Sequence, residues 1–450
     1  MALITGVTFY AILFVVAANG PHTVNGFSCK DINNNDIDWF IVYKMPVIPG
    51  HSDSKAKAGT ASYYMDSTNI DWVSLSTPVT EPHHPIGHTL GPLYNDHNEK
   101  DVSYLLYNDH PPNRRSNTRY GHAKGVLLFD KEKGFWLVHS LPRFPIAPGQ
   151  NVKFSWAKNK KGEDETMYGQ IFLCTTHEHA ALTKIRKQID FYKPFIYDEQ
   201  PTPSAANVNM APSPTTMKTT TITTTTTVMD TTPPFADIFD MDGSMSIEED
   251  DRNARVIGQK WRQPPVSILT FERKAKRPRL KKRDTSQTNS KYISIAKKHG
   301  REANIEIYSY LAERLGLTRV FAQTWRNGPR HLLSCAGQTT RTATRTFEVV
   351  NIAELKFADD IQYRTSKDHS KWAVSHDRTK PWTCIGDLNR MESQKIRGGG
   401  FVCFNNVEVR DRFLALIPRQ DQDGTVPPNV ICPQSNFIFV TNTSLTPSNM

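Results

Sequence analysis

The sequence predicts an α/β protein of two similar halves, both rich in strands, joined by a disordered insertion. Three observations support this: a His-x-Lys motif that occurs twice, strand-like runs around both copies, and a low-complexity segment between them. His122 and Lys124 form the first motif, and His369 and Lys371 form the second. Residues two apart in a strand point to the same side, so each pair would project together. With 450 residues, the chain is long enough for one large two-lobed domain.

The two motifs are followed by a second matching element. The segments that begin seventeen residues after each histidine share a Leu and an Arg in register, Leu141 with Arg143 and Leu388 with Arg390. We interpret this as one ancestral unit present twice. Each copy would then supply one His and one Lys to a shared site.

The first half, predicted over residues 27–198, reads as a series of strands. Runs of β-branched and aromatic residues bounded by Pro, Gly or Asn predict strands. They cover residues 38–46, 104–109, 122–129, 135–139 and 168–174, and residues 179–189 have helix potential. The second half, predicted over residues 291–438, repeats this pattern. Its strands cover residues 320–326, 368–374, 382–389 and 401–404, with a strand or short helix at 347–357 and an amphipathic helix from 292 to 312.

The start of the chain is typical of a secretory signal peptide, which we place at residues 1–20. Residues 3–18 are mostly apolar and uncharged. The run is shorter than the ~20 residues that span a bilayer, although a membrane anchor is the alternative. Once the signal is removed, no stable membrane association is expected. In an oxidising compartment the six cysteines would form disulfides, for which the sequence allows fifteen pairings.

Residues 199–290 are predicted to be a disordered insertion. Residues 215–232 contain 12 Thr, a composition typical of an O-glycosylated stalk. An acidic stretch and then a basic one follow. Residues 251–302 carry 16 Lys and Arg against 4 Asp and Glu, so the rest of the chain is near neutral despite the net charge of +10. We interpret the basic run as a solvated, protease-sensitive linker whose charge could attract phosphate groups, with a nuclear import signal as the alternative. Lys281, Lys282 and Arg283 form a candidate convertase site.

Two His and two Lys suit the cleavage of a phosphodiester. One neutral imidazole would attack phosphorus and form a phosphohistidine, while the other, protonated, would give its proton to the leaving oxygen. The lysines would hold the non-bridging oxygens. This chemistry favours mild acid, because one histidine must be charged and the other neutral. It needs no metal or other cofactor. The histidines at 83, 84, 88, 177 and 179 lack the carboxylates of a metal site, and no CxxC spacing indicates zinc.

Seven runs resemble the deoxyribonuclease II family, which has the phospholipase D superfold. They lie within residues 29–198 and 290–435 and read YLLYNDHPP, HAKGVLLFD, GFWLVHSLPRFP, FAQTWRNG, DHSKWAVS, WTCIGDLNR and RGGGFVC. The resemblance implies a phospholipase D-like pseudo-dimer of two α/β/α lobes, each with a mixed β-sheet. It also implies a metal-independent endonuclease that favours acid, acts on DNA and leaves 3′-phosphates. A secreted or lysosomal location follows from it as well.

The resemblance carries over five catalytic residues, His122, Lys124, His369, Lys371 and Asn389. Asn389 is included because the run from Gly386 is similar to the Gly-Ser-x-Asn element of phospholipase D enzymes. Two departures stand out. The usual acidic residue five positions after each Lys is missing, since Asp130 and Asp377 lie six after it, and Ala373 replaces a Cys of the family. The implied disulfides are Cys29–Cys174, Cys335–Cys432 and Cys384–Cys403. Asn442, in a tail at residues 439–450, begins a glycosylation sequon.

Four further residues are candidates for contact with DNA. Trp325 and Trp372 could stack on bases, and Arg326 and Arg397 could meet phosphates. The alternatives are buried strand aromatics and arginines in ion pairs.

We therefore expect an acid endonuclease with a DNA substrate, and prefer His122 as nucleophile and His369 as general acid. The alternatives are an inactive secreted DNA-binding paralogue, or a phosphodiesterase of the same superfold that acts on RNA or lipid. The two intact His-x-Lys pairs argue against the paralogue. The sequence leaves open whether the chain forms a homodimer.

Overall fold

The structure is a computed structural model that describes residues 26–149, 151–201, 266–271, 292–327, 330–332, 334–338 and 347–418. The first half of the protein here means residues 26–201, and the second half means residues 266–418. Several predicted features lie outside the described residues: the signal peptide, the Thr-rich and basic segments, Cys432 and Asn442.

The first half contains an eight-stranded sheet that is antiparallel throughout. Its strand order is β10 (Ile196–Gln200), β6 (Ser103–Asn108), β7 (Lys124–Phe129), β8 (Lys133–His139), β9 (Gln170–Glu178), β3 (Trp39–Lys44), β4 (Ser62–Asp66), β5 (Val73–Ser74). The mixed sheet expected in each lobe is therefore wrong for this half. A parallel pair needs a long crossover, whereas neighbours such as β7 and β8 are joined by a tight turn.

The second half also contains an eight-stranded sheet, in which β13 and β15 form a parallel pair. Its strand order is β11 (Val266–Phe271), β12 (Tyr292–Lys297), β20 (Gly399–Asn405), β19 (Trp382–Gly386), β18 (Trp372–Ser375), β13 (Arg319–Gln323), β15 (Phe347–Asn351), β14 (Cys335–Gln338). Two small sheets pair β1 (Cys29–Lys30) with β2 (Asp36–Ile37) and β16 (Glu354–Lys356) with β17 (Gln362–Arg364). The helices are α1 (Ser54–Ala58), α2 (Pro85–Asn95), α3 (Leu182–Phe191), α4 (Ile307–Arg314) and α5 (Val407–Ala415).

Two sequence predictions are wrong in this half. The helix predicted from residue 292 is strand β12 at its start, and only residues 307–314 form a helix. The β-branched Ile293 and Ile295 alternate with residues that face the other side of the sheet, and Gly300, with φ 125°, separates strand from helix. The insertion predicted to be disordered through residue 290 contains β11, which pairs with β12 over its full length.

The central five strands of the two sheets have the same order. They run β6-β7-β8-β9-β3 in the first sheet and β13-β18-β19-β20-β12 in the second. Between the first and second of these strands in the chain, the first half has α1, β4, β5 and α2 and the second half has α4. In both halves a helix follows the last, α3 after β9 and α5 after β20. This correspondence matches the repeated His-x-Lys unit seen in the sequence.

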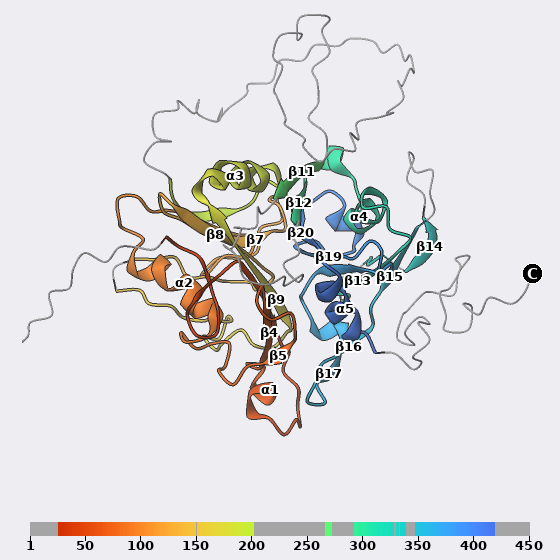
Figure 1. The fold of residues 1–450 in the computed structure, drawn as a ribbon, viewed down its shortest axis with the longest axis horizontal. Helices are drawn as coiled ribbons and strands as arrows, with labels where there is room; N and C mark the ends of the chain where they lie inside the picture. The colour runs from red at the N-terminus through yellow and green to blue at the C-terminus, as the bar shows by residue number, and fades with distance from the viewer. Residues whose placement is uncertain are drawn as a thin grey trace, which may run out of the picture. The chain divides into compact units, whose positions relative to one another are not determined.

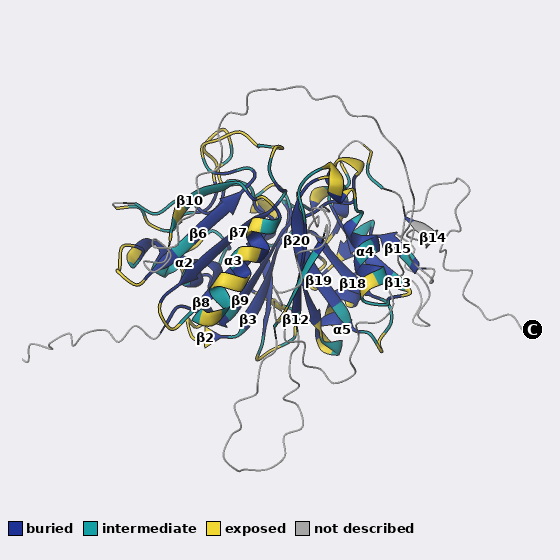
Figure 2. Ribbon diagram, turned by 90° about the horizontal axis from the view of Figure 1, so that it is seen from above, coloured by how far each residue is buried: buried dark blue, intermediate teal, exposed yellow. Residues whose placement is uncertain are grey.

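Three apolar clusters hold the layers together, and one of them is shared by the two sheets. In both views the two sheets lie side by side (Figures 1 and 2), and their inner strands are buried, whereas the edge strands β5, β10 and β11 are partly or fully exposed. The shared cluster includes Trp39 of β3 and Phe404 of β20, whose ring centroids are 5.2 Å apart, together with residues of α3 and α5. The other two clusters lie beneath α2 and beneath α4. The second sheet therefore has α4 on one face and α3 and α5 on the other, whereas the first sheet has α2 on one face and the shared cluster on the other.

Two disulfides brace the described chain. Cys29–Cys174 links β1 to β9, and Cys384–Cys403 joins directly paired residues of β19 and β20. Both are pairings that the family resemblance implied. None of the helices in the described ranges is long and apolar enough to span a membrane.

Candidate functional site

The two His-x-Lys motifs meet where the halves join, and each is held by the opposite half. Lys124 begins β7 and Lys371 directly precedes β18, so both histidines lie just before a strand rather than within it. The backbone N–H of His122 donates to the carbonyl of Gly398 at 2.8 Å, and that of His369 donates to Gly169 at 2.9 Å. That both motifs serve one catalytic site stays a prediction.

The ring of His122 is fixed by a backbone carbonyl of the second half. Its Nδ1 lies 2.7 Å from the carbonyl oxygen of Asp387, so Nδ1 carries the proton that it donates there. Nε2 then has the free lone pair. Burial lowers the pKa of His122 well below its usual range, and Lys124, Arg397 and Lys371 lower it further against the opposing charge of Asp109. The shift favours the neutral form of this imidazole.

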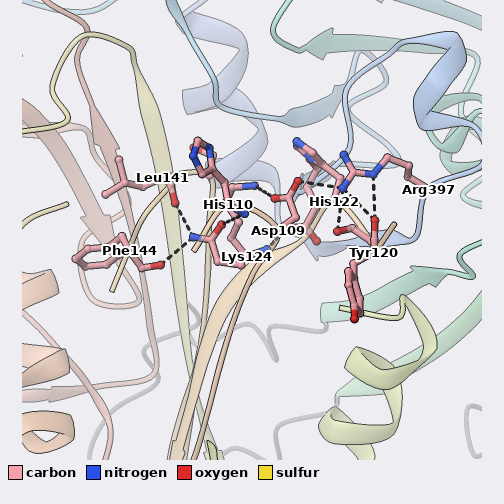
Figure 3. Close-up of polar contacts among 12 residues, drawn as sticks. Asp109, His110, Tyr120, His122, Lys124, Leu141, Phe144 and Arg397 are labelled. Atoms are coloured by element: carbon pink, nitrogen blue, oxygen red, sulfur yellow. Dashed lines mark hydrogen bonds and ion pairs between the residues drawn. The ribbon is translucent and has the colours of Figure 1, made fainter. Parts of the chain in front are cut away.

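Lys124 belongs to a buried charge network around Asp109. One carboxylate oxygen of Asp109 accepts from Lys124 Nζ, and the other accepts from Arg397 at 3.0 Å (Figure 3). The Arg397 guanidinium also donates to the carbonyls of Tyr120 and Gly121. Burial by itself would raise the pKa of Asp109, but the positive charges of Lys124 and Arg397 outweigh it and hold that pKa well below normal.

His369 lies between two aromatic rings. Tyr168 stacks on it with centroids 4.2 Å apart, and Trp325 meets it edge-on at 4.8 Å. Its Nε2 is buried and has no hydrogen-bond partner among the described residues. Burial lowers the pKa of His369 well below its usual range, and the nearby charges of Lys371, Lys124 and Lys44 add to this effect. This nitrogen therefore lacks the hydrogen bond that a buried imidazole nitrogen normally makes.

Lys371 and Asp387 both titrate near neutral pH. Lys371 is 4% exposed, and burial together with Lys124 lowers its pKa to about 7, although Asp109, Asp387 and Asp368 oppose this. Burial raises the pKa of Asp387 to about 7, against the backbone N–H of Gly400 and the charge of Lys124. Asp387 also accepts from the backbone N–H of Lys124 at 3.3 Å, which is a further contact between the halves.

Asn389 binds the segment that carries Trp325, the residue whose ring meets His369. Its Oδ1 accepts from Thr324 Oγ1 at 3.2 Å and from the backbone N–H of Trp325 at 3.3 Å. Trp325 is half-buried and stays a candidate for stacking on a base. Arg326, next to it, has a buried Nε without a partner in the described part of the chain, and burial and Arg390 lower its pKa. Arg326 therefore stays a candidate for binding phosphate.

Two of the residues expected to contact DNA have other surroundings. Trp372 is completely buried in the shared cluster, and its Nε1–H donates to the hydroxyl of Tyr43 at 3.0 Å. No face of its ring is open to a base, so we withdraw it as a DNA contact. Arg397 is bound to Asp109 inside the protein, which matches the alternative of an arginine in an ion pair. Its contribution is to the charge network of the site.

Sequence reasoning assigned no role to three residues of this site: Asp109, Tyr168 and Asp387. Asp109 and Asp387 both lie in runs that resemble the family, each directly after a strand, which was the available signal. Tyr168 gave no such signal, because its contact with His369 depends on the packing of the two halves. Within the described ranges, no group of three or more His, Cys, Asp or Glu side chains is arranged to hold a metal.

This arrangement supplies what nucleophilic displacement at phosphorus requires. It has one neutral imidazole with a free nitrogen, a second imidazole with an unpartnered nitrogen, and two lysines with positive charge between them. Lys124 and Lys371 are close enough for the charge of Lys124 to lower the pKa of Lys371.

The sequence matches known proteins over almost its whole length. A model of the deoxyribonuclease II family matches residues 28–422. Plancitoxin-1 of Acanthaster planci is 29% identical over 410 residues, which cover 90% of this chain and 95% of that protein. Deoxyribonuclease-2-alpha of Mus musculus is 29% identical over 424 residues, with coverage of 93% and 97%. The protein of the same name from Rattus norvegicus is 30% identical over 424 residues, with coverage of 93% and 98%.

Proposed function

Because the chain belongs to the deoxyribonuclease II family, we propose that it is an endonuclease that cleaves DNA phosphodiesters at mildly acidic pH, without a metal, through a phosphohistidine. The observation that carries this proposal is the meeting of the two His-x-Lys pairs between the halves, with each histidine bound to a glycine carbonyl of the opposite half. We further propose that the two halves form a phospholipase D-like pseudo-dimer and that the protein acts in a secreted or lysosomal setting.

In the first step, Nε2 of neutral His122 attacks phosphorus while the bond from phosphorus to the 5′-oxygen breaks. The Nδ1–H bond to the Asp387 carbonyl supports this assignment, because it leaves the Nε2 lone pair free. Protonated His369 gives its proton to the departing 5′-oxygen. Lys124 and Lys371 stabilise the charge on the non-bridging oxygens. The product is a phosphohistidine in which phosphorus is still bonded to the 3′-oxygen of the upstream strand.

In the second step, water attacks the phosphohistidine. His369, now neutral, takes a proton from the water, and the bond between phosphorus and His122 breaks. The strand leaves with a 3′-phosphate, and His369 is again protonated. Atoms and protons balance over the two steps.

The lowered pKa of His122 supports its role as nucleophile, whereas the lowered pKa of His369 opposes its role as general acid. His122 must stay neutral to attack, and its low pKa keeps it so below neutral pH. His369 must be protonated, although burial and the charge of Lys371 favour its neutral form in the free protein, so the negative charge of the bound phosphodiester would have to raise its pKa. Lys371, whose pKa is about 7, is also charged mainly below neutral pH.

Plasmid nicking tests this proposal. Wild-type protein and His369→Ala would be assayed at mildly acidic and at neutral pH, with excess chelator. We expect chelator-resistant nicking in acid that the variant loses, and 3′-phosphate ends in the product. Nicking that the chelator abolishes, or that survives in the variant, would refute the two-histidine mechanism.

A further inference from the structure

Two buried lysines outside the His-x-Lys motifs occupy matching places in the two halves. Lys44 ends β3 and Lys297 ends β12, and these strands correspond in the two sheets. Each side chain is fully buried and donates to two backbone carbonyls. Lys44 Nζ donates to the carbonyls of Thr166 and Tyr168, and Lys297 Nζ donates to those of Gln394 and Lys395 at 2.8 and 2.7 Å.

The carbonyls that these lysines hold lie just before the two glycines that receive the histidines. Thr166 and Tyr168 precede Gly169, and Gln394 and Lys395 precede Gly398. The strand pairing places the two lysines in the same position relative to these glycines. Lys44 is paired with Gln170, the residue after Gly169, and Lys297 is paired with Gly399, the residue after Gly398. Each lysine therefore secures the segment whose glycine carbonyl accepts the backbone N–H of a histidine from the other half.

We propose that Lys44 and Lys297 are positioning residues: Lys44 fixes the segment that holds His369, and Lys297 fixes the segment that holds His122. Their role in catalysis rests on the function proposed above, whereas their role in holding the two segments does not. Lys44 also holds the carbonyl of Tyr168, the residue that stacks on His369, so it fixes both the backbone and the ring contacts of that histidine.

The chemistry explains why lysine suits these positions. The carbonyls belong to irregular segments, and buried carbonyls without a donor are costly. One ammonium group has three donors and can serve two carbonyls at once. Burial lowers the pKa of each lysine to about 7, opposed at Lys44 by Asp368 and Glu165 and at Lys297 by Glu306, while Arg397 adds to the lowering at Lys297. A buried cation without its own carboxylate partner is expensive, so the contacts it makes must compensate.

Amide hydrogen exchange tests this without any reference to activity. In Lys297→Met, we expect the amide of His122 to exchange at least ten times faster while that of His369 keeps its wild-type rate. Lys44→Met should give the reverse pattern, so each variant is the control for the other. Lys133→Met is a further control, because this half-exposed lysine is paired with Asp36 outside the site and should change neither amide.

Wild-type exchange at both histidines in the two folded Met variants would overturn the proposal. Exchange that rises over the whole chain would mean that a Met variant has not folded. The same measurement would then use Lys44→Gln and Lys297→Gln, which keep an N–H donor without the charge. Faster exchange at only the histidine whose segment the mutated lysine holds would support the proposal, and wild-type exchange at both histidines would overturn it. In a nuclease assay, folded Met variants should lose about ten- to a hundred-fold in kcat with little change in KM. An inactive wild-type protein would refute the proposed function and leave the exchange result standing.

Discussion

His122 donates its backbone N–H to the carbonyl of Gly398, in the other half of the protein, at 2.8 Å. His369 and Gly169 repeat this contact in the opposite direction at 2.9 Å. Neither half therefore holds its own histidine by itself. The site exists only where both halves are packed together, and this explains why a chain with two similar halves would keep both motifs intact.

The first prediction concerns the two histidines. His122→Ala and His369→Ala should each lower nicking by about 10³-fold or more, because one removes the nucleophile and the other the proton donor. Supercoiled plasmid with quantified nicked product provides the measurement. His83→Ala is the control, since His83 is exposed and lies outside the site. Residual activity above a tenth of wild type in either site variant would contradict the mechanism.

The second prediction concerns pH and the binding of DNA. Lys371, with a pKa of about 7, is charged below that pH, and Asp387, also with a pKa of about 7, is neutral below it. As pH rises through 7, the site loses a positive charge and gains a negative one. Both changes weaken the binding of a phosphodiester anion.

Fluorescence anisotropy with labelled DNA and His369→Ala, which binds without cleaving, measures this effect between pH 5 and 9. We expect Kd to rise steeply above pH 7. The added change Lys371→Arg should reduce that rise, because an arginine stays charged over this range. A Kd that is flat with pH in the parent variant would show that these two groups do not govern binding.

The sequence predicted the strands well where the local pattern was strong. The run from Asp38 to Pro46 became β3, and the runs at residues 104–109 and 135–139 became β6 and β8. The meeting of the motifs also followed from the repeat. The helix expected at residues 292–312 was wrong, since β12 is stabilised by pairing with β11 and β20 on its two sides, which no local pattern reveals.

Contacts between the halves were out of reach of the sequence for a related reason. Arg397 pairs with Asp109 across 288 residues, and the ring of Tyr168 meets His369 across the boundary between the halves. As an arginine, Arg397 was a candidate for binding a DNA phosphate, but inside the protein it forms an ion pair with the carboxylate of Asp109. Periodicity reports which residues are buried, not which buried residues meet.

The third prediction concerns the two glycines that receive the histidines. A Cβ at Gly398 would lie 2.0 Å from the carbonyl oxygen of Tyr192, and one at Gly169 would lie 2.7 Å from Cγ of Asp368. Gly398→Ala and Gly169→Ala should therefore separate the segments, lower Tm and reduce kcat by tenfold or more.

Gly91→Ala is the matched control for these substitutions. Gly91 is in α2, and a Cβ there would meet nothing within 4 Å. Because Gly91 precedes Pro92 in this helix, alanine is expected to bring no gain in stability, but kcat should stay unchanged. Wild-type kcat in both Gly398→Ala and Gly169→Ala would show that the close approach of the segments is not needed.

The fourth prediction concerns the charge network. Asp109→Asn keeps the shape of the side chain but leaves Lys124 and Arg397, which are 7% and 9% exposed, without their carboxylate. Removing one partner from a buried ion pair costs about 3–5 kcal/mol. The variant should lose about that much free energy of unfolding in urea at pH 5. Asp36→Asn is the control, because Asp36 also pairs with two lysines but is 40% exposed, so the change should cost at most about 1 kcal/mol.

The dependence of this loss on pH gives a second check with a fixed sign. The pKa of Asp109 is lower in the folded protein than in the unfolded chain, so its contribution is fully present above the unfolded value of about 3.9. It is lost as pH falls below that value toward the folded pKa. The difference between wild type and Asp109→Asn should thus be the same at pH 5 and pH 7 and shrink below about pH 4. A difference that grew in that acidic range would mean that Asp109 does not stabilise the fold through its charge.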